Sequence, residues 1–294
     1  MAVMYNAQNV DEKYASILEP NLYYGSIFVP GVTCTDKYQT GPAGGIFVHK
    51  LSTSAVEVGK PGRDFTDEET SDELIPILLN NNYQKSKKIY GVQAAAVAFP
   101  LANENLANAI KECEEGRQLS GLGCLVQEAN AAALTNEITV DGIKEDVVAT
   151  RQEIIQDKGR ANIVLCTPGY YSKVLLAAGK DFEPVRNDRI AATGNVGQWL
   201  GFTFIEAAAG AAAAVKYYDH TNTLKTVKLV DGNTHVEYVM YYAEAFSIVP
   251  NFETARLVDS ENFVGTKAQV ELNCGFRVTN PKLARVRKST KTAA

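Results

Sequence analysis

The sequence lacks the short motifs that mark many enzymes and metalloproteins. It has no HExxH, GxSxG, DxDxDG or CxxC pattern, and its three histidines, His49, His220 and His235, lie in no nucleophile or metal-binding arrangement. The adjacent acids Glu68 and Glu69 lie in a charged stretch, without the apolar surroundings that would separate their acidities. We therefore expect no catalytic residue, no metal site and no cofactor.

Long apolar runs and paired cysteines are also missing. The longest apolar stretch, AAAGAAAAV at 207–215, is about half as long as a membrane-spanning helix requires. The N-terminal stretch has no basic segment followed by an apolar one, so we expect neither a secretory signal nor contact with a membrane. The cysteines are odd in number and widely spaced, which favours reduced, partly buried thiols in a cytosolic setting over a disulfide framework or a zinc site: Cys34, Cys113, Cys124, Cys166 and Cys274.

Strong net charge is absent as well. The chain of 294 residues carries a net charge of −5, which argues against a protein whose main surface binds nucleic acid, because such binding neutralises phosphates with Lys and Arg. With 46% hydrophobic and 21% charged residues, the composition is typical of a folded globular protein of one large or two ordinary domains.

The first 45 residues do not have the pattern of a compact unit. A short amphipathic segment ends before Pro20, and a stretch rich in aromatic residues, Gly and Pro follows, with Tyr23, Tyr24 and Phe28. These aromatic side chains have no partner in their own stretch. They indicate either an arm that packs on another molecule or an irregular segment wrapped on its own domain.

Two strand-like stretches follow, at 45–51 and 74–97, with a highly charged connection between them. Compact domains rarely keep so long a connection unless it is functional or mobile. Seven acids lie within 57–73, and lysines follow in the returning strand, a distribution that suits a hairpin lying on a neighbouring copy of the chain; solvated charge is the alternative. The candidate contact residues here are Lys60, Arg63, Asp67, Glu68, Glu69, Lys85, Lys87 and Lys88.

Residues 103–135 are helical in character. Two apolar stripes at helical spacing are out of register with each other, and Gly116, Gly121 and Gly123 lie near the change. Since each glycine costs about 1 kcal/mol relative to Ala inside a helix, we expect a break or bend there.

The next part alternates between helix and strand. A helix is predicted after Asp141, with Ile143, Val147, Ile154 and Ile155 inward and Gly159 as its stop. A buried strand at 162–166 precedes a helix in which Thr167 caps, Pro168 is the first residue, Tyr171, Val174, Leu175 and Ala178 share one face, and Gly179 is the end.

Three glycines, Gly194, Gly197 and Gly201, precede the strand FTFIE. A phosphate-binding loop would need GxxxxGK[ST], and a dinucleotide fingerprint needs a strand before its glycines and a helix after them. We therefore interpret the glycines as turn residues that deliver Trp199, Phe202 and Phe204 to a core. Helices and strands in this order indicate an α+β or α/β fold.

Three stretches, in this order, resemble the major capsid protein of tailed bacteriophages, the Hong Kong 97-type fold. NIVLCTPGYYSKVLLAAG is similar to a strand and helix of that family's A domain, and GNVGQWLGFTFIEA to its glycine-rich entry into an A-domain strand. YYAEAFSIVP followed by NFVGTKAQVELNCGFRVTNPKLARV resembles the family's C-terminal strands and Asn-Pro exit.

The resemblance implies an α+β fold with an N-terminal arm, an E-loop β-hairpin, a long spine helix in a P domain, and an α/β A domain. Its division of this chain is arm 1–44, E-loop hairpin 45–97, P domain 98–145, A domain 146–250, P-domain and C-terminal strands 251–287, and basic tail 288–294.

The resemblance further implies a structural, non-enzymatic protein that forms pentamers and hexamers of an icosahedral shell around double-stranded phage DNA. Expected partners are other copies, the DNA through non-specific contact, a portal, possible decoration proteins and a separate scaffolding protein, since no charged helical region precedes the core. Assembly is expected in the host cytoplasm, and the protein is expected in the virion. Some members crosslink an E-loop lysine to a neighbour's Asn, and Lys60 is the only lysine between residues 51 and 84.

Two other functions stay open. Encapsulins share this fold and enclose cargo enzymes, although their N-terminus generally begins with a cargo-binding helix. A cytosolic α/β enzyme built on 151–215 would be a small monomer or dimer. The basic end of the chain, with Lys282, Arg285, Arg287, Lys288 and Lys291, either faces DNA or a neighbour's acidic loop, or is a solvated tail.

Overall fold

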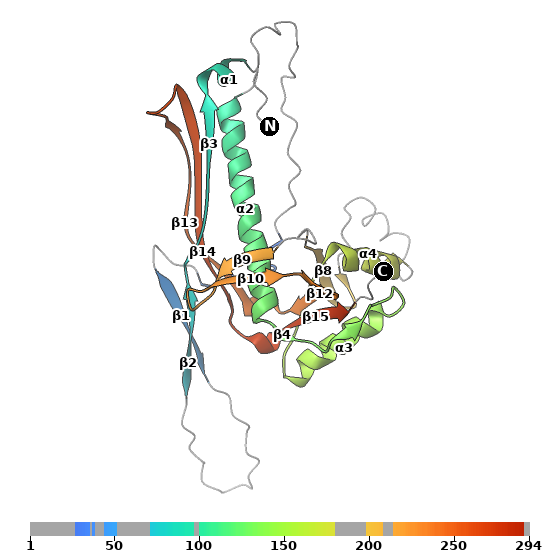
Figure 1. Cartoon of the computed structure of the whole chain (residues 1–294). Coiled ribbons are helices and arrows are strands. Elements are labelled where there is room, and N and C mark those ends of the chain that lie inside the picture. Colours follow the sequence, from blue (N-terminus) through green and yellow to red (C-terminus); the bar gives the residue numbers. More distant parts are fainter. Residues whose placement is uncertain are drawn as a thin grey trace, which may run out of the picture. The chain divides into compact units, whose positions relative to one another are not determined.

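The computed structural model describes residues 27–35, 37–38, 44–51, 71–96, 100–179, 198–207 and 214–290. Figure 1 labels their helices and strands. Contacts divide the chain into two units. The described part of the first unit lies within Tyr83–Gly116 and Glu253–Leu272, and the second unit holds the other described residues. Each unit is described by itself.

An eight-stranded mixed sheet is the centre of the second unit. Its main path runs β4-β15-β12-β6-β8-β7, with β11 paired to β12 and β5 to β15. β6 pairs parallel with β8 and antiparallel with β12, so it is hydrogen-bonded on both edges. The bounds are Asn130–Ala131 (β4), Thr135–Asn136 (β5), Ile163–Cys166 (β6), Gln198–Trp199 (β7), Phe202–Glu206 (β8), Val230–Asp231 (β11), Thr234–Tyr241 (β12) and Ala284–Thr290 (β15).

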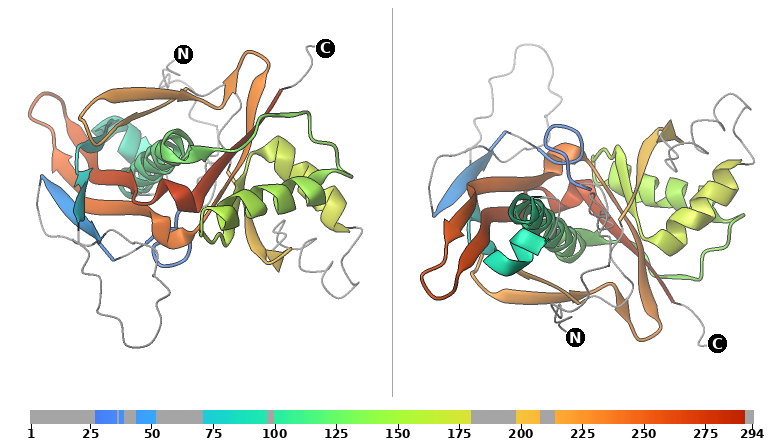
Figure 2. Two further views of the ribbon diagram at one scale, coloured as in Figure 1. Left: turned by 90° about the horizontal axis from the view of Figure 1, so that it is seen from below. Right: turned by 90° about the horizontal axis from the view of Figure 1, so that it is seen from above.

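Helices α3 (Ile143–Gln156) and α4 (Pro168–Gly179) pack together against one face of this sheet (Figure 2). Alternate residues of β6, β8 and β12 form the sheet's side of that core, as the period of two in a strand requires. The predicted strand at 162–166 and the helix from Pro168 to Gly179 are confirmed. The hydroxyl of Thr167, however, donates to the carbonyl of Glu237 (3.0 Å) in place of capping the helix.

The other face of the sheet is covered by the described segment 27–35 and the start of β13 (Phe246–Asp259). The Tyr241 hydroxyl donates to the Thr33 carbonyl (2.9 Å), and the Tyr241 and Phe246 rings meet edge to face. Phe28 is buried against Phe246, with ring centroids 4.9 Å apart. Enclosure on both faces explains why IVLC in β6 is wholly buried.

The end of α3 has a Schellman motif. The N–H of Gly159 donates to the Ile154 carbonyl (2.8 Å), and the N–H of Lys158 to the Ile155 carbonyl (2.9 Å). Lys158, with φ of 60°, takes the left-handed position that glycine usually occupies. Ile155 is 46% exposed, so the prediction that it points inward is wrong.

Helix α2 runs without interruption from Leu101 to Glu128, and the break expected near its glycines is wrong. The glycines serve close packing: a Cβ on Gly121 would lie 3.1 Å from the Phe28 ring, and one on Gly123 would lie 2.8 Å from Val215. Tertiary contact therefore outweighs the low helix propensity of Gly. Every residue from 120 to 126 is buried, so this part of the helix has no single apolar stripe.

In the first unit, the N-terminal part of α2 packs on strands. The second strand-like stretch is divided into β2 (Asp72–Leu78), which belongs to the second unit, β3 (Asn81–Tyr90) and a short helix α1 (Gly91–Ala96), where strand was predicted. β3 is an edge of a three-stranded sheet in the order β13-β14-β3, with β13 at Phe246–Asp259 and β14 at Gly265–Val278. The core between α2 and this sheet consists of Tyr83, Leu106, Ala109, Cys113, Val270 and Leu272.

Two further antiparallel pairs belong to the second unit. β1 (Gly45–Leu51) pairs with β2, and β9 (Ala214–Tyr218) pairs with β10 (Leu224–Lys228). Strand 45–51 was predicted, and β1 confirms it. Two short 3-10 turns, Ala243–Ala245 and Pro281–Leu283, precede β13 and β15.

The turn before FTFIE is described from Gln198 onward. Leu200 and Gly201, with φ of 52° and 81°, join β7 to β8 in a two-residue hairpin of the kind that requires two positive φ angles. Trp199, Phe202 and Phe204 are buried. Gly194 and Gly197 lie outside the described residues.

The basic C-terminal end requires a correction. β15 continues to Thr290, so 288–290 belong to the sheet and not to a tail. Arg285 and Arg287 are buried. Arg287 forms an ion pair with Asp146 of α3, and Arg285 forms one with Asp157, the residue after α3, so neither arginine contributes to a basic surface. Their partners lie more than a hundred residues away in sequence, where no local pattern reveals them.

All five cysteines are free, as predicted, and they are buried more completely than the partial burial expected. Within the described ranges, no helix is long and apolar enough to cross a membrane.

Candidate interaction surface

The β1–β2 hairpin has two faces that differ in burial. On one face, Ile46 and Val48 pack with Ile77, Leu79 and Val249 in a small core. The opposite face carries the cross-strand pairs Phe47–Pro76, His49–Leu74 and Leu51–Asp72. This second face, made of these six residues, is called the open hairpin face below.

The open hairpin face exposes large apolar side chains to solvent. Phe47 is 63%, Leu51 64% and Leu74 53% exposed. The Nδ1 atom of His49 lies 2.5 Å from the Asp72 carboxylate in the middle of them. Grouped apolar residues with a polar pair among them are typical of a surface that another molecule covers.

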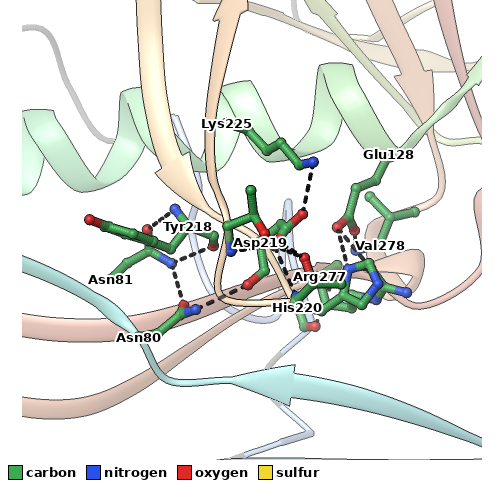
Figure 3. Close-up of polar contacts among 12 residues, drawn as sticks. Asn80, Asn81, Glu128, Tyr218, Asp219, His220, Lys225, Arg277 and Val278 are labelled. Atoms are coloured by element: carbon green, nitrogen blue, oxygen red, sulfur yellow. Dashed lines mark hydrogen bonds and ion pairs between the residues drawn. The ribbon is translucent and has the colours of Figure 1, made fainter.

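The root of the hairpin is held by backbone and amide hydrogen bonds. The Leu79 N–H donates to the Gly44 carbonyl (3.2 Å) and closes the two strands. The Asn81 side chain both donates to the Tyr218 carbonyl (2.9 Å) and accepts from the Tyr218 N–H (2.8 Å), as Figure 3 shows. Asn80 donates to the Asp219 carbonyl (3.0 Å). The end of β2 is therefore fixed to the β9–β10 hairpin.

The β9–β10 turn is itself organised by Asp219. Its carboxylate accepts from the N–H groups of Thr221 and Thr223, both at 2.9 Å, and lies 3.3 Å from the Lys225 ammonium. Burial alone would raise the pKa of this carboxyl, but the bonds from Thr221, Thr223 and Lys225 lower the pKa well below its usual value. The carboxylate is thus a charged acceptor that defines the turn.

A second acid joins α2 to the same region. Glu128, the last residue of α2, accepts from the Arg277 guanidinium (2.8 Å) and from the Val278 N–H (2.9 Å). Nδ1 of His220 lies 2.5 Å from Nη1 of Arg277, and because a guanidinium can only donate, the imidazole accepts there. Figure 3 shows both acids beside the turn. These side chains have a structural role, because each of them forms hydrogen bonds or ion pairs with other residues of the same chain.

Among the described residues, no group of three or more His, Cys, Asp or Glu is placed to hold a metal ion.

The candidate contact residues chosen from the sequence fall into four sets. Phe28 is buried in its own chain. Lys85 and Lys87 form ion pairs with Glu112 of α2, at 3.0 and 2.5 Å, and their hydrogen bonds lower the pKa of Glu112. Lys88 is exposed, without an ion-pair partner among the described residues. The others lie outside the described residues: Tyr23, Tyr24, Lys60, Arg63, Asp67, Glu68 and Glu69.

The apolar residues of the open hairpin face were missed. Ile46, Phe47 and Val48 are consecutive apolar residues in a strand, so the two faces of β1 are both apolar. That pattern predicts that both faces of β1 are packed against other parts of the protein or another molecule. It could have identified Phe47 as a contact residue.

Neither a model of a known protein family nor a curated protein sequence matches the chain. Solved structures do match it. The capsid of the cyanophage P-SCSP1u is 10% identical with a TM-score of 0.67, covering 96% of this chain and 93% of its own. The capsid of Ralstonia phage GP4 is 8% identical with a TM-score of 0.67, covering 100% and 98%. The chain has the fold of phage capsid structures.

A third phage capsid agrees. The mature capsid of bacteriophage PhiM1 is 12% identical, with a TM-score of 0.63 and coverage of 100% of this chain and 97% of that chain. The likeness extends over both units, and the mixture of helices and sheets confirms the predicted α+β class. With identities this low, the phage capsid fold is shared although the residues are not.

Proposed function

We propose that the chain is the major capsid protein of a tailed bacteriophage. The observation that carries this proposal is the likeness to phage capsid structures over nearly the whole length of both chains. In this function, copies form pentamers and hexamers of an icosahedral shell that encloses double-stranded DNA.

The regions of the Hong Kong 97-type fold are proposed as follows. The arm is 1–44, the E-loop hairpin 45–97, the P domain 98–145, the A domain 146–250, and the closing P-domain strands 251–287. The long uninterrupted helix α2 suits the spine helix, and the β1–β2 hairpin suits the two strands of the E-loop. The basic tail is reduced to the residues after Thr290, since β15 includes 288–290.

The open hairpin face supports assembly. Covering a Phe or Leu side chain contributes about 1.5–3 kcal/mol, so three such residues per copy provide several kcal/mol when a neighbouring copy covers them. The same contact repeats around a shell, so a modest area per contact stabilises a large particle.

The remaining partners are proposed from the resemblance. They are a separate scaffolding protein, a portal, possible decoration proteins, and DNA held by non-specific contact. The protein would be part of the virion after assembly in the host cytoplasm. No enzymatic activity is proposed.

The test is electron microscopy and sedimentation of the full chain, expressed alone and from the phage with its other structural proteins. We expect closed icosahedral particles of this chain, with double-stranded DNA that survives external nuclease in the phage preparation. A chain that stays no larger than a dimer in both preparations would contradict the capsid function. Closed particles holding a protein cargo and no DNA would instead support an encapsulin-type compartment.

A further inference from the structure

The β9–β10 pair (Ala214–Tyr218 and Leu224–Lys228) buries one of its faces and exposes the other. On the buried face, Val215 and Tyr217 pack on α2, where Gly123 leaves room for them. Because side chains alternate along a strand, the remaining residues of β9 point away from the helix. The exposed face, called the ribbon face below, consists of Ala214, Lys216, Tyr218, Leu224, Thr226 and Lys228.

The ribbon face carries two lysines and no acid. Lys216 is exposed and has no ion-pair partner among the described residues. Lys228 lies 3.3 Å from Asp231, but the two side chains are 62% and 75% exposed, so this ion pair contributes little. Lys216 is opposite Thr226 in the register, which makes Lys216 and Lys228 diagonal neighbours about 7–8 Å apart. Two cations so close together attract a partner of negative charge.

Many lysines elsewhere in the chain are neutralised by acids. Those within 3.3 Å of a carboxylate include Lys85, Lys87, Lys173 and Lys225. The whole chain has a net charge of −5, so the ribbon face is a local cationic patch on an acidic protein. Such a patch is what a protein without a strongly basic surface would use to contact a polyanion.

The backbone of the ribbon face is fixed from its buried side. Ser120 of α2 donates to the Lys216 carbonyl (2.8 Å). The Asn81 side chain bonds to both the N–H and the carbonyl of Tyr218 (2.8 and 2.9 Å), as Figure 3 shows. The Asp219 carboxylate organises the turn between the two strands. The ribbon face is therefore preorganised, and a partner that binds it does not have to order the backbone.

The chemistry of the ribbon face fits a phosphate backbone. Phosphate oxygens accept hydrogen bonds from lysine, threonine and tyrosine side chains, and Lys216, Thr226 and Tyr218 are neighbours here. A DNA duplex carries one negative charge per about 1.7 Å of its axis, so several phosphates lie within reach of two lysines about 7–8 Å apart. The face has no Arg, Asn or Gln, the residues that form bidentate contacts with base edges. It therefore suits binding without sequence preference.

We propose that the ribbon face contacts the phosphate backbone of packaged DNA, and that it accordingly lines the inside of the shell. The proposal rests on the proposed function, because it requires a shell that encloses double-stranded DNA. Arg285 and Arg287 do not serve this contact, since both are buried and neutralised within the chain. Two lysines bind DNA weakly in a single subunit, but the many copies of a shell act together.

Lysine modification in particles tests this contact. DNA-filled particles from the phage and DNA-free particles of the same chain are treated with acetic anhydride, and mass spectrometry measures the reaction rate of each lysine. We expect Lys216 and Lys228 to react several-fold more slowly in filled particles, because phosphates cover their ammonium groups. Lys282 is the matched control, since it is exposed and has no ion-pair partner among the described residues. Its rate should be the same in both forms.

Three results would overturn the contact. Equal rates at Lys216 in filled and DNA-free particles would show that DNA does not cover the face. Equally low rates in both forms would show that protein covers it, as a neighbouring copy or an acidic protein segment would. The same slowing at Lys282 as at Lys216 would show that DNA limits entry of the reagent and does not contact the ribbon face specifically.

Photochemical crosslinking gives an independent measurement that keeps both lysines. All five native cysteines are buried, so Thr226→Cys adds an accessible thiol that 4-azidophenacyl bromide can label. We expect light to join this position to DNA in filled particles, with a yield several-fold above that of Ser172→Cys, an exposed position on α4. Circular dichroism verifies that both variants fold. Equal yields from the two positions would contradict the proposal.

Failure of the ribbon contact and failure of the capsid function are distinguishable. If the unaltered chain forms DNA-filled particles in which Lys216 reacts as it does in DNA-free ones, the ribbon contact alone is wrong. If no particles form, or if they hold no DNA, the proposed function fails and the ribbon contact that rests on it falls as well.

Discussion

The sheet interior and the β1–β2 hairpin differ in which side chains they bury. In the interior, Arg287 is 4% and Asp146 8% exposed, and the two are paired with each other and with further partners. On the open hairpin face, Phe47 and Leu51 are more than 60% exposed. One region satisfies even its charges within the chain, whereas the other leaves large apolar side chains exposed. In the proposed shell, the first set of residues folds the subunit and the second set joins it to another copy.

The largest effect is expected from breaking the interior ion pair. Arg287 donates to the Asp146 carboxylate (2.6 Å) and to the Ala133 carbonyl (2.6 Å). Arg287→Met leaves Asp146 buried without its cation, and it should lower the free energy of unfolding by about 3–5 kcal/mol. Urea unfolding measures this, with Lys288→Met on the same strand as the control. A loss as small as the control's would show that the interior does not depend on its charges.

An intermediate effect is expected at the Asp219 turn, which fixes the root of the hairpin. Asp219 is buried, and its carboxylate accepts hydrogen bonds from the N–H groups of Thr221 and Thr223. Asp219→Ala removes this acceptor and should lower the free energy of unfolding by about 1–3 kcal/mol.

The same residue predicts a pH dependence. The folded state lowers the pKa of the Asp219 carboxyl, so its stabilisation is present above the unfolded value of about 3.9 and is lost as the pH falls through the folded value. The difference in unfolding free energy between the unaltered chain and Asp219→Asn should therefore shrink below about pH 4. A difference that stays constant from neutral to acidic pH would contradict the role of the charge.

A smaller, stabilising effect is expected where α3 ends. Lys158 has φ of 60°, a conformation that costs a residue with a Cβ about 1 kcal/mol. Lys158→Gly should raise the unfolding free energy by roughly 0.5–1 kcal/mol. Lys158→Ala, which loses the charge but keeps the Cβ, should give no such gain, and equal gains from both would refute the conformational explanation.

The smallest effect on stability is expected on the open hairpin face. Phe47→Ser combined with Leu74→Ser should change the unfolding free energy of the unassembled subunit by no more than about 0.5 kcal/mol, because both side chains are already exposed. Particle yield, measured by sedimentation, should nevertheless fall sharply. Normal particle yield would show that another copy does not cover this face.

Local patterns predicted the elements that depend on local chemistry. The strand at Ile163–Cys166 and the helix from Pro168 to Gly179 have a continuous apolar run and a Pro–Gly boundary, and both were found as expected. The glycines of α2 led to the wrong prediction of a break in the helix, because their close partners, Phe28 and Val215, lie about ninety residues away in the chain. Spacing within a helix contains no information on such partners.

The functional surfaces were harder to predict for the same reason. Arg285 and Arg287 resemble a basic tail in sequence, yet the acids that neutralise them lie in and just after α3. Exposure of Phe47 or Tyr218 depends on what the rest of the fold leaves uncovered. The resemblance that indicated a phage capsid fold came from the order of several weak motifs, and it was confirmed by the likeness of the whole chain to solved capsids.

Hydrogen exchange of free subunits and of assembled particles tests whether the β1–β2 hairpin is covered by a neighbouring copy. Amides of β1 and β2 should exchange much more slowly in particles than in free subunits, while those of β6, already enclosed on both faces, should change little. Equal exchange of the β1–β2 hairpin in the two forms would contradict the claim that this hairpin joins one copy to the next.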